Sequence, residues 1–196
     1  MTRLFDILIA LVSLIIFSPL FILLALWIKV DSIGPVFYKQ KRVGRFGKEF
    51  YLYKFRSMHI DADKAGLLTF GNTDKRITKS GVFMRRYKLD ELPQLLNVLV
   101  GKMSMVGPRP EVKKYTNLYT DNQKIVLNVR PGITDFASVT YYNENSILEQ
   151  QSNPEQYYID IIMPDKIRLN LVYINNPTVL NYFRIIFLTV KTALKK

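Results

Sequence analysis

The chain has 196 residues, enough for one ordinary domain together with an anchor. Its 28 Lys and Arg outnumber 16 Asp and Glu, and the formal net charge of +12 indicates an anionic partner. No zinc spacing or RNA-binding signature is present, so a membrane surface or a phosphorylated substrate is expected and nucleic acid is not. With no cysteine and only His59, thiol chemistry is excluded and a serine triad is disfavoured, leaving carboxylates, lysines, arginines and tyrosines for any catalysis.

The N-terminal segment carries no charge from Ile7 to Ile28 and is long enough to cross a bilayer. No small-residue cleavage site follows it, so a removed signal peptide is not expected. Ser18 and Pro19 interrupt it, since proline removes one helical hydrogen bond and a serine hydroxyl can satisfy a freed carbonyl. Two arrangements agree with this segment. One is a kinked helix that spans the membrane, which the composition alone favours, and the other is a helix–break–helix hairpin that enters and leaves on the same face of the membrane.

A basic, aromatic segment follows at residues 36–58. Phe50, Leu52 and Lys54 alternate with aromatic neighbours, which predicts a strand, and residues 44–48 predict a turn before it. Such a hairpin can lie against anionic lipid through its positive charges. Residues 61–75 are predicted to be a loop. A second amphipathic helix is predicted from Thr78 to about Lys88 and carries the adjacent arginines 85 and 86.

The stretch that follows contains an acidic pair, Asp90 and Glu91, just before Pro93. Leucines then recur at helical spacing and Gly101 stands at a C-cap position, which predicts a short helix that begins near the proline. The two carboxylates are therefore expected at the mouth of this helix, beside its positive dipole end. Acidic residues at this position are also common helix caps, which is the simpler explanation.

Residues 107–110, Gly-Pro-Arg-Pro, hold Arg109 between two prolines on a stiff, extended backbone. An arginine held in this way can clamp a phosphate through two hydrogen bonds, although a turn with a solvated arginine has the same sequence. One ionised carboxylate, a second carboxylate suited to a hard cation and a fixed arginine together describe a phosphoryl-transfer site.

Two further helices are predicted in the C-terminal half. The first runs from Glu111 to about Leu127, with Tyr115, Leu118 and Tyr119 on one face. The second covers residues 179–196, which are apolar but interrupted by basic residues at helical spacing. This pattern predicts an interfacial helix lying in the headgroup plane, with a helix packed on the core as the alternative.

These segments resemble a known family. Residues 89–95 (Leu-Asp-Glu-Leu-Pro-Gln-Leu), 97–99, 103–104 and 106–111 (Val-Gly-Pro-Arg-Pro-Glu) are similar to the signature block of the bacterial sugar transferases, which are monotopic phosphoglycosyl transferases. Residues 54–58 and 129–134 match further family motifs. The chain departs from the family after Thr134, where it has Asp135-Phe136 instead of glycine and leucine or tryptophan, and at Asn170, where the family commonly has aspartate. These departures bear on the identity of the sugar.

The resemblance implies a fold and a location. The expected fold is α/β-associated and mostly helical, with a re-entrant N-terminal helix–break–helix, a small β element and C-terminal interfacial amphipathic helices. Residues 1–30 would form the re-entrant membrane hairpin, broken at Ser18 and Pro19 with both ends cytoplasmic. Residues 31–196 would form a catalytic domain on the cytoplasmic face of the bacterial inner membrane, including the interfacial C-terminal helix.

The resemblance also implies an activity: transfer of a sugar-1-phosphate from a UDP-sugar to polyprenol (undecaprenyl) phosphate, with release of UMP, as the first membrane step of glycoconjugate synthesis. Asp90 would form an aspartyl-phosphosugar intermediate, and Glu91 would help to hold Mg²⁺. The expected phosphate-binding residues are Lys54, Arg56, Arg85 and Arg109. Anionic membrane lipids and downstream glycosyltransferases are possible partners.

Two other functions fit the residues. A membrane-bound aspartyl-phosphate phosphohydrolase would use the same carboxylate with water as acceptor. A non-catalytic membrane adaptor would use only the basic surface, and would need neither the acidic pair nor the rigid Pro-Arg-Pro segment. A requirement for polyprenol phosphate separates the transferase from the hydrolase.

Overall fold

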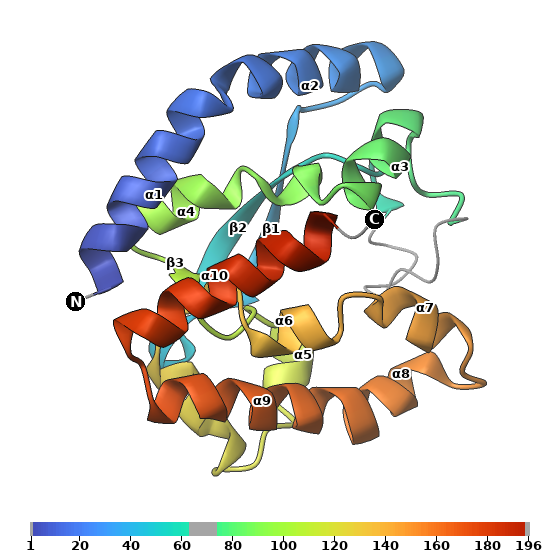
Figure 1. Ribbon diagram of the computed structural model, residues 1–196. Helices are drawn as coiled ribbons and strands as arrows, with labels where there is room; N and C mark the ends of the chain where they lie inside the picture. Colours follow the sequence, from blue (N-terminus) through green and yellow to red (C-terminus); the bar gives the residue numbers. More distant parts are fainter. Residues whose placement is uncertain (1, 63–73, 195–196) are drawn as a thin grey trace.

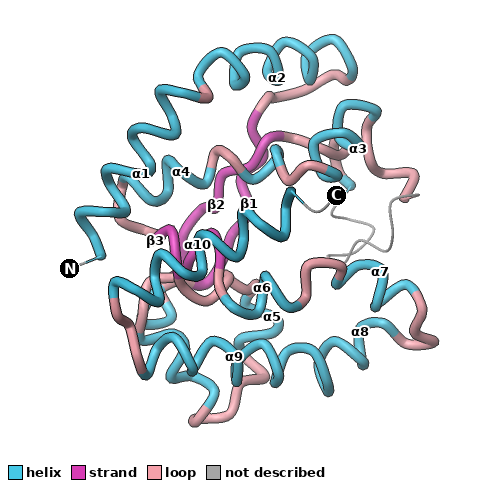
Figure 2. Tube along the Cα trace, in the orientation of Figure 1, coloured by secondary structure: helices cyan, strands magenta, loops and turns pink. Residues whose placement is uncertain are grey.

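The computed structural model describes residues 2–62 and 74–194. The described chain is mostly helical with a small amount of β-structure, as predicted, and α1 and α2 lie on the opposite side of the molecule from α8 and α9 (Figures 1 and 2). The α-helices are α1 (Thr2–Ile16), α2 (Ser18–Asp31), α3 (Lys79–Arg86), α4 (Gln94–Leu99), α5 (Lys113–Thr116), α6 (Phe136–Thr140), α7 (Glu144–Glu149), α8 (Pro154–Tyr157), α9 (Met163–Asn175) and α10 (Val179–Leu194). The strands are β1 (Phe37–Val43), β2 (Glu49–Phe55), β3 (Ser104–Val106) and β4 (Gly132–Thr134).

Helices α1 and α2 meet at a bend of 61°. Pro19 has no N–H to donate to the carbonyl of Ile15, and the hydroxyl of Ser18 donates to that carbonyl instead at 2.8 Å. The break expected at this pair of residues is therefore present in the fold. Within residues 2–62 and 74–194, no single helix has the length and apolar character needed to cross a membrane, whereas α1 and α2 together do.

Two charged side chains fasten α1 to the rest of the molecule. Asp6 is only 2% exposed and accepts hydrogen bonds from the Ser104 hydroxyl, the Met105 N–H and the Tyr182 hydroxyl. Arg3 donates to backbone carbonyls at the end of α4. The other face of the α1–α2 pair remains uncovered, and its exposed apolar side chains include Leu8, Leu11, Val12, Ile15, Ile16, Ile22, Leu23, Leu26 and Val30.

The β1–β2 hairpin lies at the centre of the N-terminal half. Its strands are antiparallel, with Phe37 opposite Phe55 and Val43 opposite Glu49, and the predicted turn between them is a 3₁₀ turn (η1, Arg45–Gly47). Phe50 and Leu52 are buried in a cluster with residues of α1 and α4, whereas Phe55 packs with α2 and α3. Strand β2 is thus held from both sides, which gives Lys54 a fixed position.

Strands β3 and β4 pair in parallel and bring two distant motifs together. The Gly107 N–H donates to the carbonyl of Thr134, and the Gly132 N–H donates to that of Pro108. A Cβ atom built on Gly132 would come within 2.1 Å of the Gly107 nitrogen. The two segments can approach this closely only because both positions lack a side chain, and this approach fixes the start of the Pro-Arg-Pro segment.

The C-terminal half packs its helices around a second core, which contains Tyr115, Leu148, Tyr158, Ile162 and Met163 among others. The helix predicted from Glu111 to about Leu127 is wrong in its extent. Only the four residues of α5 and a later 3₁₀ segment (η4, Gln123–Asn128) are helical there. Residues 120–122, Thr-Asp-Asn, favour turns because their side chains compete for backbone hydrogen bonds.

The other predicted elements agree better with the structure. Helix α3 is capped by Thr78, whose side chain accepts from the Gly81 N–H. Gly101 has a φ of +78° just beyond α4, as a C-terminal glycine should. A helix also occupies residues 179–194. The predicted loop at residues 61–75 lies largely outside the described residues.

Candidate functional site

The acidic pair lies in a short 3₁₀ turn (η3, Leu89–Glu91), not in the first turn of α4. Lys88 precedes it in the left-handed conformation, with a φ of 58°, and reverses the chain after α3. Pro93 then stands at the N-cap of α4. The short helix therefore begins beside the proline as predicted, and the two carboxylates lie just before it on a separate 3₁₀ turn.

Glu91 is held by two cations. The Arg109 guanidinium donates to both carboxylate oxygens, with Nη1 at 3.0 Å from Oε2, and Lys54 Nζ donates to Oε1 at 3.0 Å. The side chains of Glu91 and Lys54 are only 15% and 17% exposed. Burial alone would raise the pKa of Glu91, but the charges of Arg109 and Lys54 outweigh it and hold this pKa well below its usual value. Glu91 is therefore ionised at any physiological pH.

Asp90 has a different environment. It is 8% exposed and accepts no hydrogen bond from any residue of the ranges 2–62 and 74–194. Burial raises the pKa of Asp90, and the negative charge of Glu91 raises it further. The positive charge of Lys54 opposes this shift, but the pKa remains above its ordinary value. The carboxylate is thus positioned by its turn, and no hydrogen bond from the described chain reduces its basicity.

The other two predicted phosphate-binding residues differ in their contacts. Arg85, in the last turn of α3, is partly buried, and its charge lowers the pKa of Asp90. Arg56 is 5% exposed and donates to the carbonyls of Ile28, Ser32 and Ile33 at the end of α2. The structure therefore brings Lys54 and Arg109 to the acidic pair and gives Arg56 a separate set of partners. The phosphate-binding role of Arg56 stays a prediction.

The backbone of Arg109 is also fixed. Its N–H donates to Oδ2 of Asp135 at 2.9 Å, and Asp135, 1% exposed, also caps helix α6 through the Ser138 N–H. Asp135 is one of the positions at which the chain departs from the family pattern. Sequence reasoning noted that departure and gave the residue no role.

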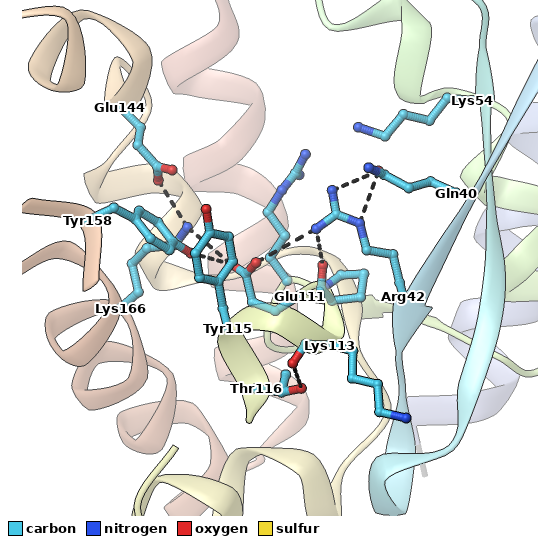
Figure 3. A network of polar contacts seen from close by, with 12 residues as sticks. Gln40, Arg42, Lys54, Glu111, Lys113, Tyr115, Thr116, Glu144, Tyr158 and Lys166 are labelled. Atoms are coloured by element: carbon cyan, nitrogen blue, oxygen red, sulfur yellow. Dashed lines mark hydrogen bonds and ion pairs between the residues drawn. The ribbon is translucent and has the colours of Figure 1, made fainter. Parts of the chain in front are cut away.

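A second polar network, also missed from the sequence, lies next to Arg109. Figure 3 shows Glu111 between Arg42 on one side and Lys166 on the other, with nitrogen–oxygen distances of 3.7 and 3.8 Å. Lys166 also pairs with Glu144 at 2.9 Å, and the Tyr158 hydroxyl donates to Glu111. Glu111 ends the Gly-Pro-Arg-Pro-Glu motif, which was the only signal in the sequence that could have identified this network.

The donor atoms fit the predicted magnesium ion. No cluster of three or more His, Asp or Glu side chains occurs in the described part of the chain. Magnesium, however, usually keeps several waters and binds one or two carboxylates together with substrate phosphates. Glu91 Oε2 accepts one hydrogen bond and has a second lone pair, and Asp90 lies beside it. Glu91 therefore fits an ion whose remaining ligands come from water and a bound phosphate.

Comparison with known proteins places the chain in a family. The model of the family described as "Bacterial sugar transferase" matches residues 1–196. The chain belongs to this family.

Three relatives illustrate the range of sugars in the family. A Bacillus subtilis (strain 168) protein, provisionally named an undecaprenyl-phosphate N-acetylgalactosaminyl 1-phosphate transferase, is 48% identical over 60% of this chain. The UDP-glucose:undecaprenyl-phosphate glucose-1-phosphate transferases of Xanthomonas campestris pv. campestris and Escherichia coli (strain K12) are 40% and 36% identical over 80% and 94% of it. The matches cover 65%, 34% and 38% of these three relatives.

Proposed function

We propose that the protein transfers a sugar-1-phosphate from a UDP-sugar to undecaprenyl phosphate and releases UMP. The observation that carries this proposal is the contrast within the acidic pair: Glu91 is held ionised by Arg109 and Lys54, while the neighbouring Asp90 accepts no hydrogen bond from any described residue. Family membership and the names of the relatives support it.

Asp90 is the proposed nucleophile. One carboxylate oxygen attacks the β-phosphorus of the UDP-sugar, and the bond from that phosphorus to the bridging oxygen breaks. The bridging oxygen keeps the bonding electron pair and leaves as part of UMP, and the sugar phosphate remains on Asp90. An oxygen of undecaprenyl phosphate then attacks the same phosphorus and releases the carboxylate. No proton has to be transferred in either step.

The cations around the pair stabilise negative charge during both steps. Arg109 and Lys54, which bind Glu91 in the free protein, would donate to phosphate oxygens when the donor is bound. Arg85 adds a further positive charge from α3. Glu91 would help to hold Mg²⁺, whose charge neutralises the diphosphate.

The proposal includes a place for the reaction. Residues 1–30 would form a re-entrant hairpin in the cytoplasmic membrane, and residues 31–196 would lie on its cytoplasmic face. Three observations support this arrangement: the 61° bend, the uncovered apolar face of α1 and α2, and the exposed apolar residues of α10, which are Leu180, Phe183, Phe187, Val190 and Leu194. The high positive charge would favour anionic lipid.

The test is to measure UMP release by the purified protein with a panel of UDP-sugars, Mg²⁺ and undecaprenyl phosphate. With labelled donor and no lipid, the protein should retain the labelled sugar phosphate, and addition of the lipid should discharge it. Asp90→Asn should retain no label, whereas the surface variant Asp121→Asn should behave like the wild type.

Three other results would contradict the proposal. Water-dependent release of sugar phosphate without lipid would favour the phosphohydrolase. Absence of turnover with every donor would favour the adaptor. Turnover that persists in Asp90→Asn would show that the lipid phosphate attacks the donor directly.

A further inference from the structure

The second polar network lines a cavity of about 110 Å³. The residues that line it include Arg42, Arg109, Glu111, Glu144 and Lys166. A cavity needs about 10–15 Å³ to admit a single water, so this space is several times larger than that minimum. It is therefore large enough for part of a small polar ligand.

Arg109 connects this cavity to the acidic pair. The same guanidinium that donates to both oxygens of Glu91 also forms part of the cavity wall. A phosphate bound at this arginine would consequently have one of its substituents within reach of the cavity. In the proposed reaction, the β-phosphate of the donor carries two substituents, the sugar through an ester bond and UMP through an anhydride bond.

The wall of the cavity alternates in charge. Cations and anions follow one another along it in the order Arg42, Glu111, Lys166 and Glu144. Two of the three ion pairs are loose, at 3.7 and 3.8 Å. Arg42 also donates to Gln40 and to the Pro110 carbonyl, and Glu111 accepts from Tyr158. Glu144 and Lys166 therefore keep the lone pair and the donors that a ligand can use. Sugar hydroxyls both donate and accept hydrogen bonds, and they match a wall of this kind.

A pyrimidine base matches the cavity less well. Flat bases stack on aromatic rings. The two tyrosine rings at the cavity, Tyr115 and Tyr158, are inclined to each other by 56° and do not form a parallel slot. The lysine also lies 5.3 Å from the ring centre of Tyr158 and covers it.

We infer that this cavity binds the sugar of the donor, and that Glu144 and Lys166 contact its hydroxyl or acetamido groups and select among sugars. This inference rests on the proposed function for its donor class. Neither residue touches the acidic pair, so both are sugar-binding residues and not catalytic residues.

The experiment measures binding of UDP-glucose, UDP-N-acetylgalactosamine and UDP by calorimetry, with Mg²⁺ and detergent-purified protein. Every variant is made in the Asp90→Asn background so that no covalent bond to the donor forms. The test variants are Glu144→Gln and Lys166→Met. The matched controls are Glu149→Gln, exposed on the same helix α7, and Arg168→Met, exposed on the same helix α9.

Each test variant should weaken binding of the preferred UDP-sugar about tenfold, because a hydrogen bond to a charged group is lost, and should change binding of UDP less than about twofold. The controls should change neither. Lys166→Met removes the cation that Glu144 pairs with and one of the two cations beside Glu111. The double variant Glu144→Gln/Lys166→Met, which removes one charge of each sign, is therefore measured with it. Circular dichroism confirms that each variant is folded.

Equal weakening of UDP and UDP-sugar would show that the cavity binds the nucleotide, and would overturn the inference. Unchanged binding of both, or a parent protein that binds no UDP-sugar, would also overturn it. Failure of the proposed function gives a different result. In that case, protein with Asp90 intact releases no UMP in the presence of undecaprenyl phosphate, even if the sugar-selective loss of binding is observed.

Discussion

Asp90 and Glu91 are adjacent, yet their surroundings shift their pKa values in opposite directions. Burial raises the pKa of Asp90, whereas the pKa of Glu91 is lowered because Arg109 and Lys54 outweigh burial. A carboxylate with a raised pKa is more basic and hence a better nucleophile, provided that it is ionised at the working pH. In the proposed reaction, the pair would thus separate two tasks: Asp90 would react, and Glu91 would maintain a fixed negative charge.

The raised pKa of Asp90 predicts that Asp90→Asn is more stable than the wild type at pH 7. A carboxyl group whose pKa is raised by folding stabilises the folded protein at pH values below the pKa that it has in the unfolded chain, about 3.9. This contribution is lost as the pH rises through the pKa of the group in the folded protein. At pH 7 the buried charge therefore costs free energy, which the amide removes. Thermal unfolding should show a higher Tm, by about 2–4 °C per kcal/mol gained, at pH 7 and no gain near pH 4.

Asp121→Asn is the control for that comparison, because Asp121 is exposed and paired with Lys124. Its Tm should not rise at pH 7. A lower Tm for Asp90→Asn at pH 7 would mean that the folded protein stabilises the ionised carboxylate, which contradicts the raised pKa.

Arg109→Lys should reduce turnover by about 10²-fold or more. The guanidinium donates to both oxygens of Glu91, and a lysine ammonium cannot reproduce this planar fork. Loss of one preorganised donor at a charged transition state typically costs about 2.7–4 kcal/mol. Initial rates of UMP release provide the measurement. Arg168→Lys, at an exposed ion pair on α9, should keep wild-type rates, and similar losses in both variants would contradict the assigned role.

At the scale of elements, the bend between α1 and α2 depends on local sequence. Pro19→Leu restores an N–H that can donate to Ile15, so it should favour one continuous helix. In the proposed membrane arrangement, a cysteine placed at Thr2 should be protected from an impermeant thiol reagent in intact cells. The same cysteine should become labelled in a larger fraction of the Pro19→Leu protein.

The native chain has no cysteine that could react in this assay. Pro154→Leu, at the first turn of α8, is the matched control and should leave Thr2 protected. Labelling of the Thr2 position in protein that retains Pro19 would show that the segment spans the membrane, and would refute the re-entrant arrangement.

Elements determined by local sequence could be predicted. The β1–β2 hairpin, α3, the cap at Gly101 and the helix at residues 179–194 follow from alternation, capping residues and helical periodicity. The pairing of β3 with β4 could not, because three-residue strands carry almost no periodic signal. The helix expected after Glu111 does not form over its predicted length, because turn-forming residues at 120–122 override the apolar pattern.

In the site, too, residues within one local motif could be predicted, and residues brought together by the tertiary fold could not. Asp90, Glu91 and Arg109 could be found from one motif, since the chemistry needs those residue types within a short stretch. The network of Arg42, Glu144 and Lys166 could not, because its members come from three distant parts of the chain and only the tertiary fold brings them together. Arg56 had a motif, yet the structure gives it carbonyl partners on α2 that no local pattern indicates.

At the scale of the whole molecule, the first and last helices are joined through one buried carboxylate. The Tyr182 hydroxyl on α10 donates to Asp6 on α1 at 2.9 Å, and both side chains are almost fully buried. Tyr182→Phe should lower the free energy of unfolding by about 1.5–3 kcal/mol, as expected for a lost hydrogen bond to a charged group.

Chemical denaturation in detergent measures this change. Tyr51→Phe is the control, because Tyr51 is 52% exposed and its ring hydroxyl lies outside the core. Equal stability of Tyr182→Phe and the wild type would show that the other donors to Asp6, Ser104 and Met105, are sufficient by themselves.

The separation of these two partners along the chain has a consequence for biosynthesis. Asp6 leaves the ribosome 176 residues ahead of Tyr182, so its carboxylate is without that donor until translation is almost finished. An unpaired acidic side chain resists transfer into hydrocarbon. In the proposed membrane arrangement, the charge would therefore oppose translocation of α1 until Ser104 and Met105, and finally Tyr182, can donate to it.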